Sequence, residues 1–168
     1  MAELVKFQKQ NLIRTAEAVR KEQYLAFTLG GETYGMDIRS IKEVIQYGGI
    51  TEVPLMPGFL RGVINLRGAV VPVIDLSVRF SRPPTEINRR TCVVILELDR
   101  TLLGIMVDNV SEVLEINTED IEPAPAFGSD LRTDFIQGVG KVAGRFVILL
   151  DVDHVLSLDE MSALAGDG

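Results

Sequence analysis

Few side chains in this sequence could carry out catalysis. The chain contains one histidine, His154, which lies close to Asp151 and Asp153, and one cysteine, Cys92, within the apolar run TCVVIL. One histidine cannot build a histidine-rich metal site, and Cys92 and His154 could serve as nucleophile and base only if the fold brought them together. We therefore expect Cys92 to be a small buried apolar residue and His154 to lie at the surface or at the end of a helix.

The sequence also lacks the short motifs of common catalytic and nucleotide-binding sites. It has no glycine-rich phosphate loop, no GxSxG and no HExxH. Asp151, Asp153 and Asp159 do not match the spacing of a calcium-binding loop. These absences predict a protein without enzymatic activity, cofactor or metal, and they favour a binding module. An enzyme that uses Cys92 remains an alternative hypothesis, which labelling of the folded protein by a thiol reagent would support.

Composition and charge exclude further classes of protein. The chain has 168 residues, 46% of them apolar, as expected for one globular domain or two small ones. A net charge of −7 argues against a nucleic-acid partner, because a phosphate backbone is bound by clustered positive charge. No apolar run approaches the roughly 20 residues of a membrane span. Charged residues near the first methionine do not fit a signal peptide, so we expect a cytoplasmic protein.

One stretch of the sequence occurs twice. Phe59–Leu76, FLRGVINLRGAVVPVIDL, reappears 76 residues later as Phe135–Val152, FIQGVGKVAGRFVILLDV, without a gap. Each copy places apolar residues on both sides of a central glycine, which predicts two strands joined by a tight turn. In the first copy this turn falls at Arg67-Gly68.

The segments that precede the two hairpins are also related. Thr91–Leu98 repeats the strand predicted at Tyr24–Leu29, and Asp99-Arg100 takes the place of the Gly30-Gly31 turn. Repeated short strands with tight turns predict an all-β protein with a few short helices, made of two small barrels. A single larger barrel or a sandwich would also fit this pattern.

The polar segment Ser81–Arg90 is the expected boundary between the two copies. Short helical turns are predicted at Ile38–Glu43, with Asp37 as the N-cap, and after Asp151. The expected organisation is an extension at 1–22, one domain at 23–164 with barrels at about 23–80 and 91–152, and a tail at 165–168.

Positions at which the two copies differ are candidates for function. Asn65 and Arg67, at the tip of the first hairpin, correspond to Lys141 and Ala143 in the second, so the hairpin does not require them. An arginine held beside a rigid turn is suited to binding a carboxylate, although an ordinary surface arginine would also fit.

Apolar residues at repeated positions suggest a second candidate site. Ile41 and Val44 in the first copy correspond to Val110 and Val113 in the second. We expect these residues to line the region between the barrels, either as plain core or as a groove for an amphipathic helix. Glu43 lies between them in the first copy, and its spacing leaves both a structural role and a partner contact open.

At this point the motifs resemble a known family. The runs GETYGMDIRSIKEVIQ, FLRGVINLRGAVVPVIDL, LLGIMVDNVSEVLEI and IEPAPAFGSDLRTDFIQGVGKVAGRFVILLDV are similar to those of the CheW family of bacterial chemotaxis, over about residues 22–164. The resemblance implies two tandem five-stranded SH3-like barrels around a shared core, with no enzymatic activity and no cofactor. It also implies an adaptor that couples the cytoplasmic tips of methyl-accepting chemoreceptors to the regulatory domain of the histidine kinase CheA.

The resemblance further implies site residues and a location. Matched by position, residues of the receptor-contacting side are Ile41, Glu43, Asn65, Arg67, Cys92 and Val113, whereas Gly62 and Val63 fall near contacts that affect the kinase. At Cys92 the family more often has a small aliphatic residue of similar size. The adaptor would be recruited to receptor arrays at the inner face of the membrane, where it could form rings with other CheW-like domains.

Three alternatives remain beside a stand-alone chemotaxis adaptor. The chain could be the CheW-like part of a larger signalling protein such as CheV, although no receiver domain follows the second barrel in this sequence. It could serve a chemosensory pathway that does not control motility. A small-barrel nucleic-acid binder is the third, and the negative charge and sparse aromatic residues count against it.

Overall fold

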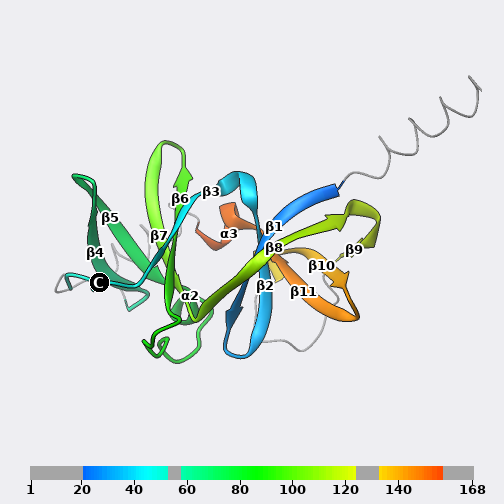
Figure 1. The fold of residues 1–168 in the computed structure, drawn as a ribbon, viewed down its shortest axis with the longest axis horizontal. Coiled ribbons are helices and arrows are strands. Elements are labelled where there is room, and N and C mark those ends of the chain that lie inside the picture. Colours follow the sequence, from blue (N-terminus) through cyan, green and yellow to red (C-terminus); the bar gives the residue numbers. More distant parts are fainter. Residues whose placement is uncertain (1–20, 53–57, 124–132, 157–168) are drawn as a thin grey trace, which may run out of the picture.

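The computed structural model describes residues 21–52, 58–123 and 133–156, which form two small barrels side by side (Figure 1). The strands of the first half are β1 Lys21–Leu29, β2 Glu32–Asp37, β3 Ile41–Gln46, β4 Leu60–Leu66 and β5 Ala69–Asp75. Those of the second half are β6 Cys92–Leu98, β7 Thr101–Val107, β8 Asn109–Asn117, β9 Ile121–Glu122, β10 Ile136–Val142 and β11 Arg145–Leu150. Single helical turns are η1 Ile38–Ser40, α2 Leu76–Arg79, η2 Thr118–Asp120, η3 Thr133–Phe135 and α3 Val152–Val155.

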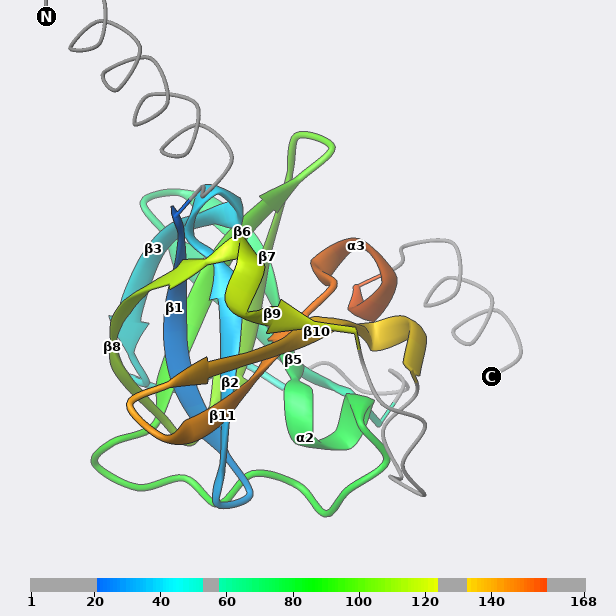
Figure 2. The same cartoon turned by 90° about the vertical axis from the view of Figure 1, so that its right-hand side faces the viewer.

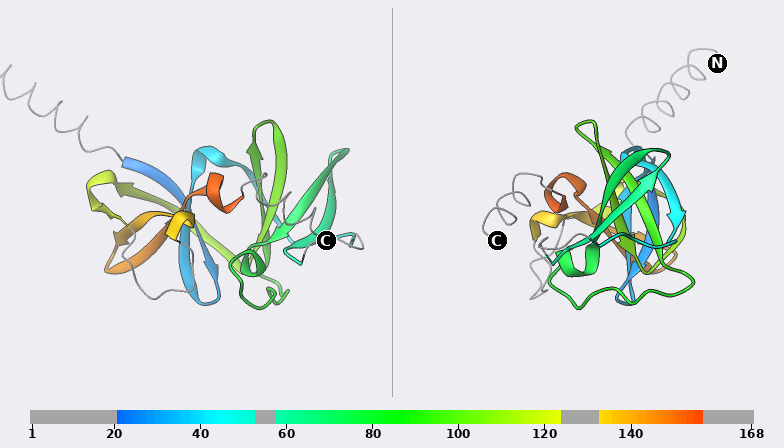
Figure 3. Two further views of the ribbon diagram at one scale, coloured as in Figure 1. Left: turned by 180° about the vertical axis from the view of Figure 1, so that it is seen from behind. Right: turned by 90° about the vertical axis from the view of Figure 1, so that its left-hand side faces the viewer.

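Two sheets build the two barrels. One sheet has the order β8-β1-β2-β11-β10-β9, and because β8 continues through η2 into β9, its two edges are joined by the chain itself. We call it barrel A. The other sheet, β3-β6-β7-β5-β4, is closed by an antiparallel bridge between Thr51 and Val63, and we call it barrel B. The expected all-β fold of two small barrels is therefore confirmed (Figures 1 and 3).

Each barrel combines strands from both copies of the repeat. The hairpin β1–β2 belongs to the first copy but pairs with β8 and β11 of the second. In exchange, β6 and β7 of the second copy pair with β3 and β5 of the first. Figure 1 shows this as blue β1 and β2 lying among yellow and orange strands. The expected barrels at 23–80 and 91–152 are therefore wrong, because pairing between strands distant in sequence decides sheet membership and no local pattern records it.

Four tight turns join the paired strands, as the sequence predicted. The central residues of each have positive φ, as two-residue hairpin turns require. In the equivalent turns of the two copies, φ is 50° at Arg67 and 51° at Ala143, and a glycine follows each. The second hairpin thus adopts the same turn with alanine in place of the arginine.

Among the residues that the structure describes, three apolar clusters form the core. One fills barrel A (Tyr24, Ile116, Val147, Leu149), one fills barrel B (Val71, Val73, Val93, Ile95, Met106), and the largest lies between the barrels. This shared core takes residues from both barrels and from the helical turns, including Leu25, Phe27, Val94, Leu96, Phe80, Val152 and Val155. Seen from behind, α3 lies between the two barrels (Figure 3). The shared core implied by the family resemblance is thus present.

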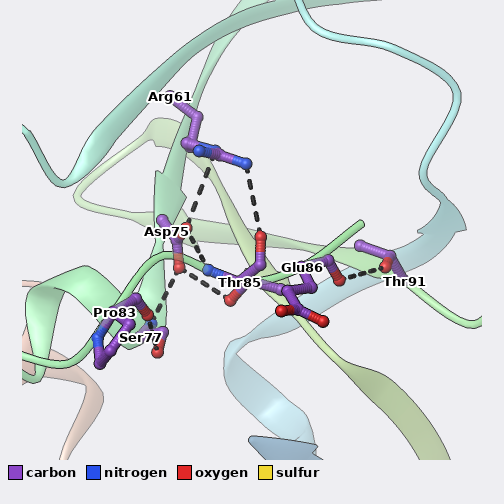
Figure 4. Close-up of polar contacts among 7 residues, drawn as sticks. All are labelled: Arg61, Asp75, Ser77, Pro83, Thr85, Glu86 and Thr91. Carbon is purple, nitrogen blue, oxygen red and sulfur yellow. Dashed lines mark hydrogen bonds and ion pairs between the residues drawn. The ribbon is translucent and has the colours of Figure 1, made fainter. Parts of the chain in front are cut away.

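The segment expected to separate the barrels instead connects two strands of barrel B. Between α2 and β6 the chain is held by Asp75, which is fully buried. Its carboxylate accepts hydrogen bonds from the backbone N–H of Ser77 at 3.0 Å, and from the backbone N–H and the hydroxyl of Thr85 at 3.0 and 2.9 Å (Figure 4). The Nε atom of Arg61 lies 3.7 Å from the same carboxylate. Residues 81–91 are therefore bound to barrel B and do not act as a loose linker.

The helical turns begin where the sequence predicted and are shorter. The Asp37 carboxylate accepts a hydrogen bond from the Arg39 N–H at 2.9 Å, but the turn ends at Ser40 and β3 follows at once. Glu43 therefore lies in a strand and not at the end of a helical turn. Asp151 caps α3 as expected. The expected extension lies outside the described residues as far as residue 20, and its last two residues, Lys21 and Glu22, already belong to β1.

Candidate functional site

An apolar surface borders the shared core on the face of the molecule formed by β3 and β8, which lie on the same side in Figures 1 and 2. Val44 on β3 pairs with Val94 of the shared core, and Val113 on β8 pairs with Leu25 of the same core. Both valines are exposed, by 39% and 49%. Because cross-strand partners share one face of a sheet, the core continues to the surface at these two positions. We call this exposed apolar surface, defined by Val44 and Val113, the inter-barrel groove, after the helix-binding groove that the sequence predicted there.

Partly buried residues continue the groove inward. Ile41, Val110 and Cys92 all pack against the shared core without being fully buried. The expectation that the repeated apolar residues lie between the barrels is therefore met. Cys92 is less buried than expected, because it is the first residue of β6 and lies at the end of that strand. Its thiol donates a hydrogen bond to the Arg90 carbonyl at 3.3 Å.

Glu43 and Arg67, two residues of the predicted receptor side, form an ion pair. Arg67 Nη2 lies 2.5 Å from Glu43 Oε1, joining β3 to the tip of the β4–β5 hairpin. The arginine side chain is 70% exposed and the glutamate 28%. The sequence does not indicate this pairing, since nothing in a spacing of 24 residues identifies partners across a barrel opening.

Asn65 has a structural role in the same hairpin. Its side-chain oxygen accepts a hydrogen bond from the Gly68 backbone N–H at 2.9 Å, so it caps the turn beside Arg67. The second hairpin forms the same turn with Lys141 at this position, so the turn can form without an asparagine. In the first copy, however, Asn65 helps to fix the turn that presents Arg67.

Gly62 and Val63, the predicted kinase-side residues, lie where barrel B closes. Val63 exchanges two backbone hydrogen bonds of 2.9 Å with Thr51. Gly62 has φ +151°, and a Cβ atom there would lie 2.2 Å from the Thr51 carbonyl oxygen. Next to this closure lies a cavity of 480 Å³, lined by residues that include Ile45, Tyr47, Ile50, Val63 and Asn65. Gly62 therefore shapes the closure of barrel B by allowing the close backbone approach to Thr51.

Replacing Gly62 with alanine is expected to lower the free energy of unfolding by about 3 kcal/mol. The added methyl group would overlap the Thr51 carbonyl, whose position is fixed by the hydrogen bonds between Thr51 and Val63. Chemical denaturation measures the loss. Gly48→Ala is the control, since its Cβ would meet nothing closer than the Gln46 carbonyl oxygen at 4.0 Å. Equal stability of the two variants would contradict this assignment.

Cys92 and His154, the two residues considered for catalysis, each have a partner close by in sequence: the Cys92 thiol donates to the Arg90 carbonyl, and His154 pairs with Asp151. His154 is exposed, and its Nδ1 atom lies 2.8 Å from the Asp151 carboxylate within α3. Within residues 21–52, 58–123 and 133–156, no group of three or more histidine, cysteine or acidic residues could hold a metal ion. In the same part of the chain, no helix is long and apolar enough to cross a membrane. At the N-cap of η1, hydrogen bonds from Arg39 lower the pKa of Asp37.

Comparisons with known proteins agree with this geometry. The family model described as "CheW-like domain" matches residues 23–160. A chemotaxis protein CheW from Klebsiella aerogenes is 40% identical over 141 residues, covering 84% of this chain and 85% of the relative. One from Bacillus subtilis is 31% identical, covering 91% and 98%. The crystal structure of the scaffolding protein TtCheW from Thermoanaerobacter tengcongensis superposes with a TM-score of 0.74 at 33% identity, covering 81% and 88%. The chain therefore belongs to the CheW family of chemotaxis scaffold proteins.

Proposed function

We propose that this protein is a non-catalytic adaptor that couples methyl-accepting chemoreceptors to a CheA-type histidine kinase. The observation that carries the proposal is the inter-barrel groove, where Val44 and Val113 expose apolar side chains beside the Glu43–Arg67 pair. An open apolar surface bordered by charged residues suits the apolar face of a helix. The family resemblance implies such a partner, because the chemoreceptors that CheW proteins bind end in a helical hairpin at their cytoplasmic tip.

The receptor-contacting residues divide into two groups. Ile41, Cys92 and Val113 belong to the groove, where burial of apolar surface would supply affinity. Glu43 and Arg67 border barrel B, and Asn65 holds the turn of Arg67. The exposed guanidinium of Arg67 would favour a partner that carries negative charge. Its ion pair with Glu43 limits the conformations of the arginine side chain.

The kinase contact is assigned to the closure of barrel B around Gly62 and Val63. A partner there would contact β4, the last strand in the sheet of barrel B. Val63 of this strand already pairs with Thr51. The two contacts use different surfaces, so receptor and kinase can bind at the same time. Each contact is expected to be weak alone and strengthened by many copies in a cytoplasmic array at the membrane, in rings with other CheW-like domains.

A binding titration tests this function. The purified chain is titrated with the regulatory domain of the CheA-type kinase encoded in the same genome, and a soluble receptor fragment is then added. We expect saturable binding in the micromolar range or tighter, about −8 kcal/mol, and a ternary complex. Val113→Asp should lose the receptor fragment and keep the kinase domain, because it places a charge in the groove.

The matched control is Phe146→Asp. Phe146 is also an exposed apolar residue of the second copy, but it lies on β11 outside the groove, so its replacement should keep receptor binding. Absence of kinase binding by the unaltered chain would disprove the adaptor role. A chemosensory pathway with an output other than motility would use the same contacts. Titration against each CheA-type kinase of the genome identifies the kinase, and so the pathway, to which this chain belongs.

A further inference from the structure

Two arginines lie at the end of the groove. Arg89 and Arg90 lie just before β6 and are separated from it by Thr91, and Cys92, the first residue of β6, pairs with Gln46 of β3. Gln46 Nε2 donates a hydrogen bond to the Arg89 carbonyl at 3.2 Å. Because Gln46 follows Val44 by two residues on the same strand, the arginines adjoin the apolar surface on the β3 side.

The backbone that carries these arginines is held in place. The Arg90 N–H donates to the Asn88 side-chain oxygen at 2.8 Å, and the Asn88 N–H donates to the Thr91 hydroxyl at 2.9 Å. Thr91 is fully buried, and its carbonyl accepts a hydrogen bond from the Tyr47 N–H at 3.0 Å. Further back, Thr85 is bound to the buried Asp75 (Figure 4). The turn is therefore a fixed platform for two long side chains.

The charges of Arg89 and Arg90 are not neutralised within the described residues. Neither arginine forms an ion pair with the part of the chain that the structure describes, and both are exposed. By contrast, four other described arginines form ion pairs: Arg39 with Asp37, Arg61 with Asp75, Arg67 with Glu43 and Arg82 with Glu32. Two adjacent unpaired cations on a fixed turn attract an anionic partner more than paired ones do.

We propose that Arg89 and Arg90 select a groove partner that carries acidic side chains beside its apolar face. The partner is an amphipathic helix of a chemoreceptor, with aspartate or glutamate residues placed over the arginines while its apolar face covers Val44 and Val113. This inference rests on the proposed function and adds to it the charge of the receptor segment that binds. Charge at the edge of a contact adds specificity and speeds association, whereas the apolar centre supplies most of the affinity.

The test uses the full chain and a soluble cytoplasmic fragment of a chemoreceptor from the same genome. The double variant Arg89→Glu/Arg90→Glu is expected to bind the fragment about tenfold more weakly at low salt. The difference should shrink in 0.5 M salt, because exposed charges are screened there. Arg145→Glu is the control, since Arg145 is an exposed arginine at the tip of the β10–β11 hairpin. Its binding should match that of the unaltered chain.

A charge exchange makes the test specific. Arginine in place of the acidic residues of the receptor segment should weaken binding to the unaltered chain and restore binding to the double variant. Binding of the double variant that equals the unaltered chain at low salt would overturn the inference, and if Val113→Asp still abolished binding, the proposed function would stand. Failure of the unaltered chain to bind any receptor fragment would overturn both.

Discussion

Replacing Asp75 with alanine is expected to lower the free energy of unfolding by about 3–5 kcal/mol. The carboxylate is fully buried and accepts three hydrogen bonds, from Ser77 and Thr85, besides facing Arg61. Its removal leaves two buried N–H groups and a half-buried guanidinium without their acceptor. Denaturant titration monitored by circular dichroism measures the loss.

The second copy of the repeat provides the control for this variant. Asp151 occupies the position equivalent to Asp75, but its side chain is 34% exposed and caps only α3, through His154. Asp151→Ala should therefore cost about 1 kcal/mol, the usual effect of a lost N-cap. Similar losses for the two variants would show that the bonds to Thr85 add little, and that residues 81–91 are not held by Asp75.

Arg67→Glu is expected to reduce receptor binding by tenfold or more while leaving the fold intact. The turn itself tolerates other residues, because Ala143 adopts nearly the same φ in the second hairpin. The substitution places two carboxylates together at the opening of barrel B, so the pair with Glu43 is replaced by repulsion. Titration with the receptor fragment measures binding, and thermal unfolding reports on the fold.

Exchange of the two charges separates pairing from direct contact. In the double variant Glu43→Arg/Arg67→Glu the ion pair can form again in reverse. Restored receptor binding would mean that the pair positions the β4–β5 hairpin, whereas binding that stays lost would mean that the guanidinium itself contacts the partner. Unfolding of Arg67→Glu at ordinary temperature would contradict both, since it would make Arg67 a structural residue.

Local features of the fold could be predicted from the sequence. The turns at Gly30-Gly31 and Arg67-Gly68 and the N-caps at Asp37 and Asp151 were all expected, because each depends on residues within a few positions. The internal repeat favoured two barrels over one, since two copies of one hairpin suggest two copies of one folding unit. The length of η1 was overestimated, because β3 gains its hydrogen bonds from β6, about 50 residues away.

Contacts between distant segments could not be predicted. Nothing near Glu43 in the sequence identifies Arg67 as its partner, and nothing near Asp75 identifies Thr85. The polar composition of residues 81–90 indicated a boundary between the two copies, yet buried hydrogen bonds from Thr85 to Asp75 hold the segment to barrel B. The candidate groove was anticipated at Val44 and Val113 because apolar residues at equivalent positions of a repeat face equivalent surroundings.

The exchange of hairpins between barrels gives this chain the architecture of a domain-swapped dimer whose two subunits have been joined end to end. The shared core corresponds to the interface of that dimer, and residues 80–91 correspond to the junction. Neither half of the chain contains a complete barrel, so both barrels should unfold in one cooperative transition. The repeat also relates surface positions in pairs, such as Val44 with Val113 and Arg67 with Ala143. Duplication thus supplied two copies of one surface, and the differences between the copies are what the proposed binding of two different partners would use.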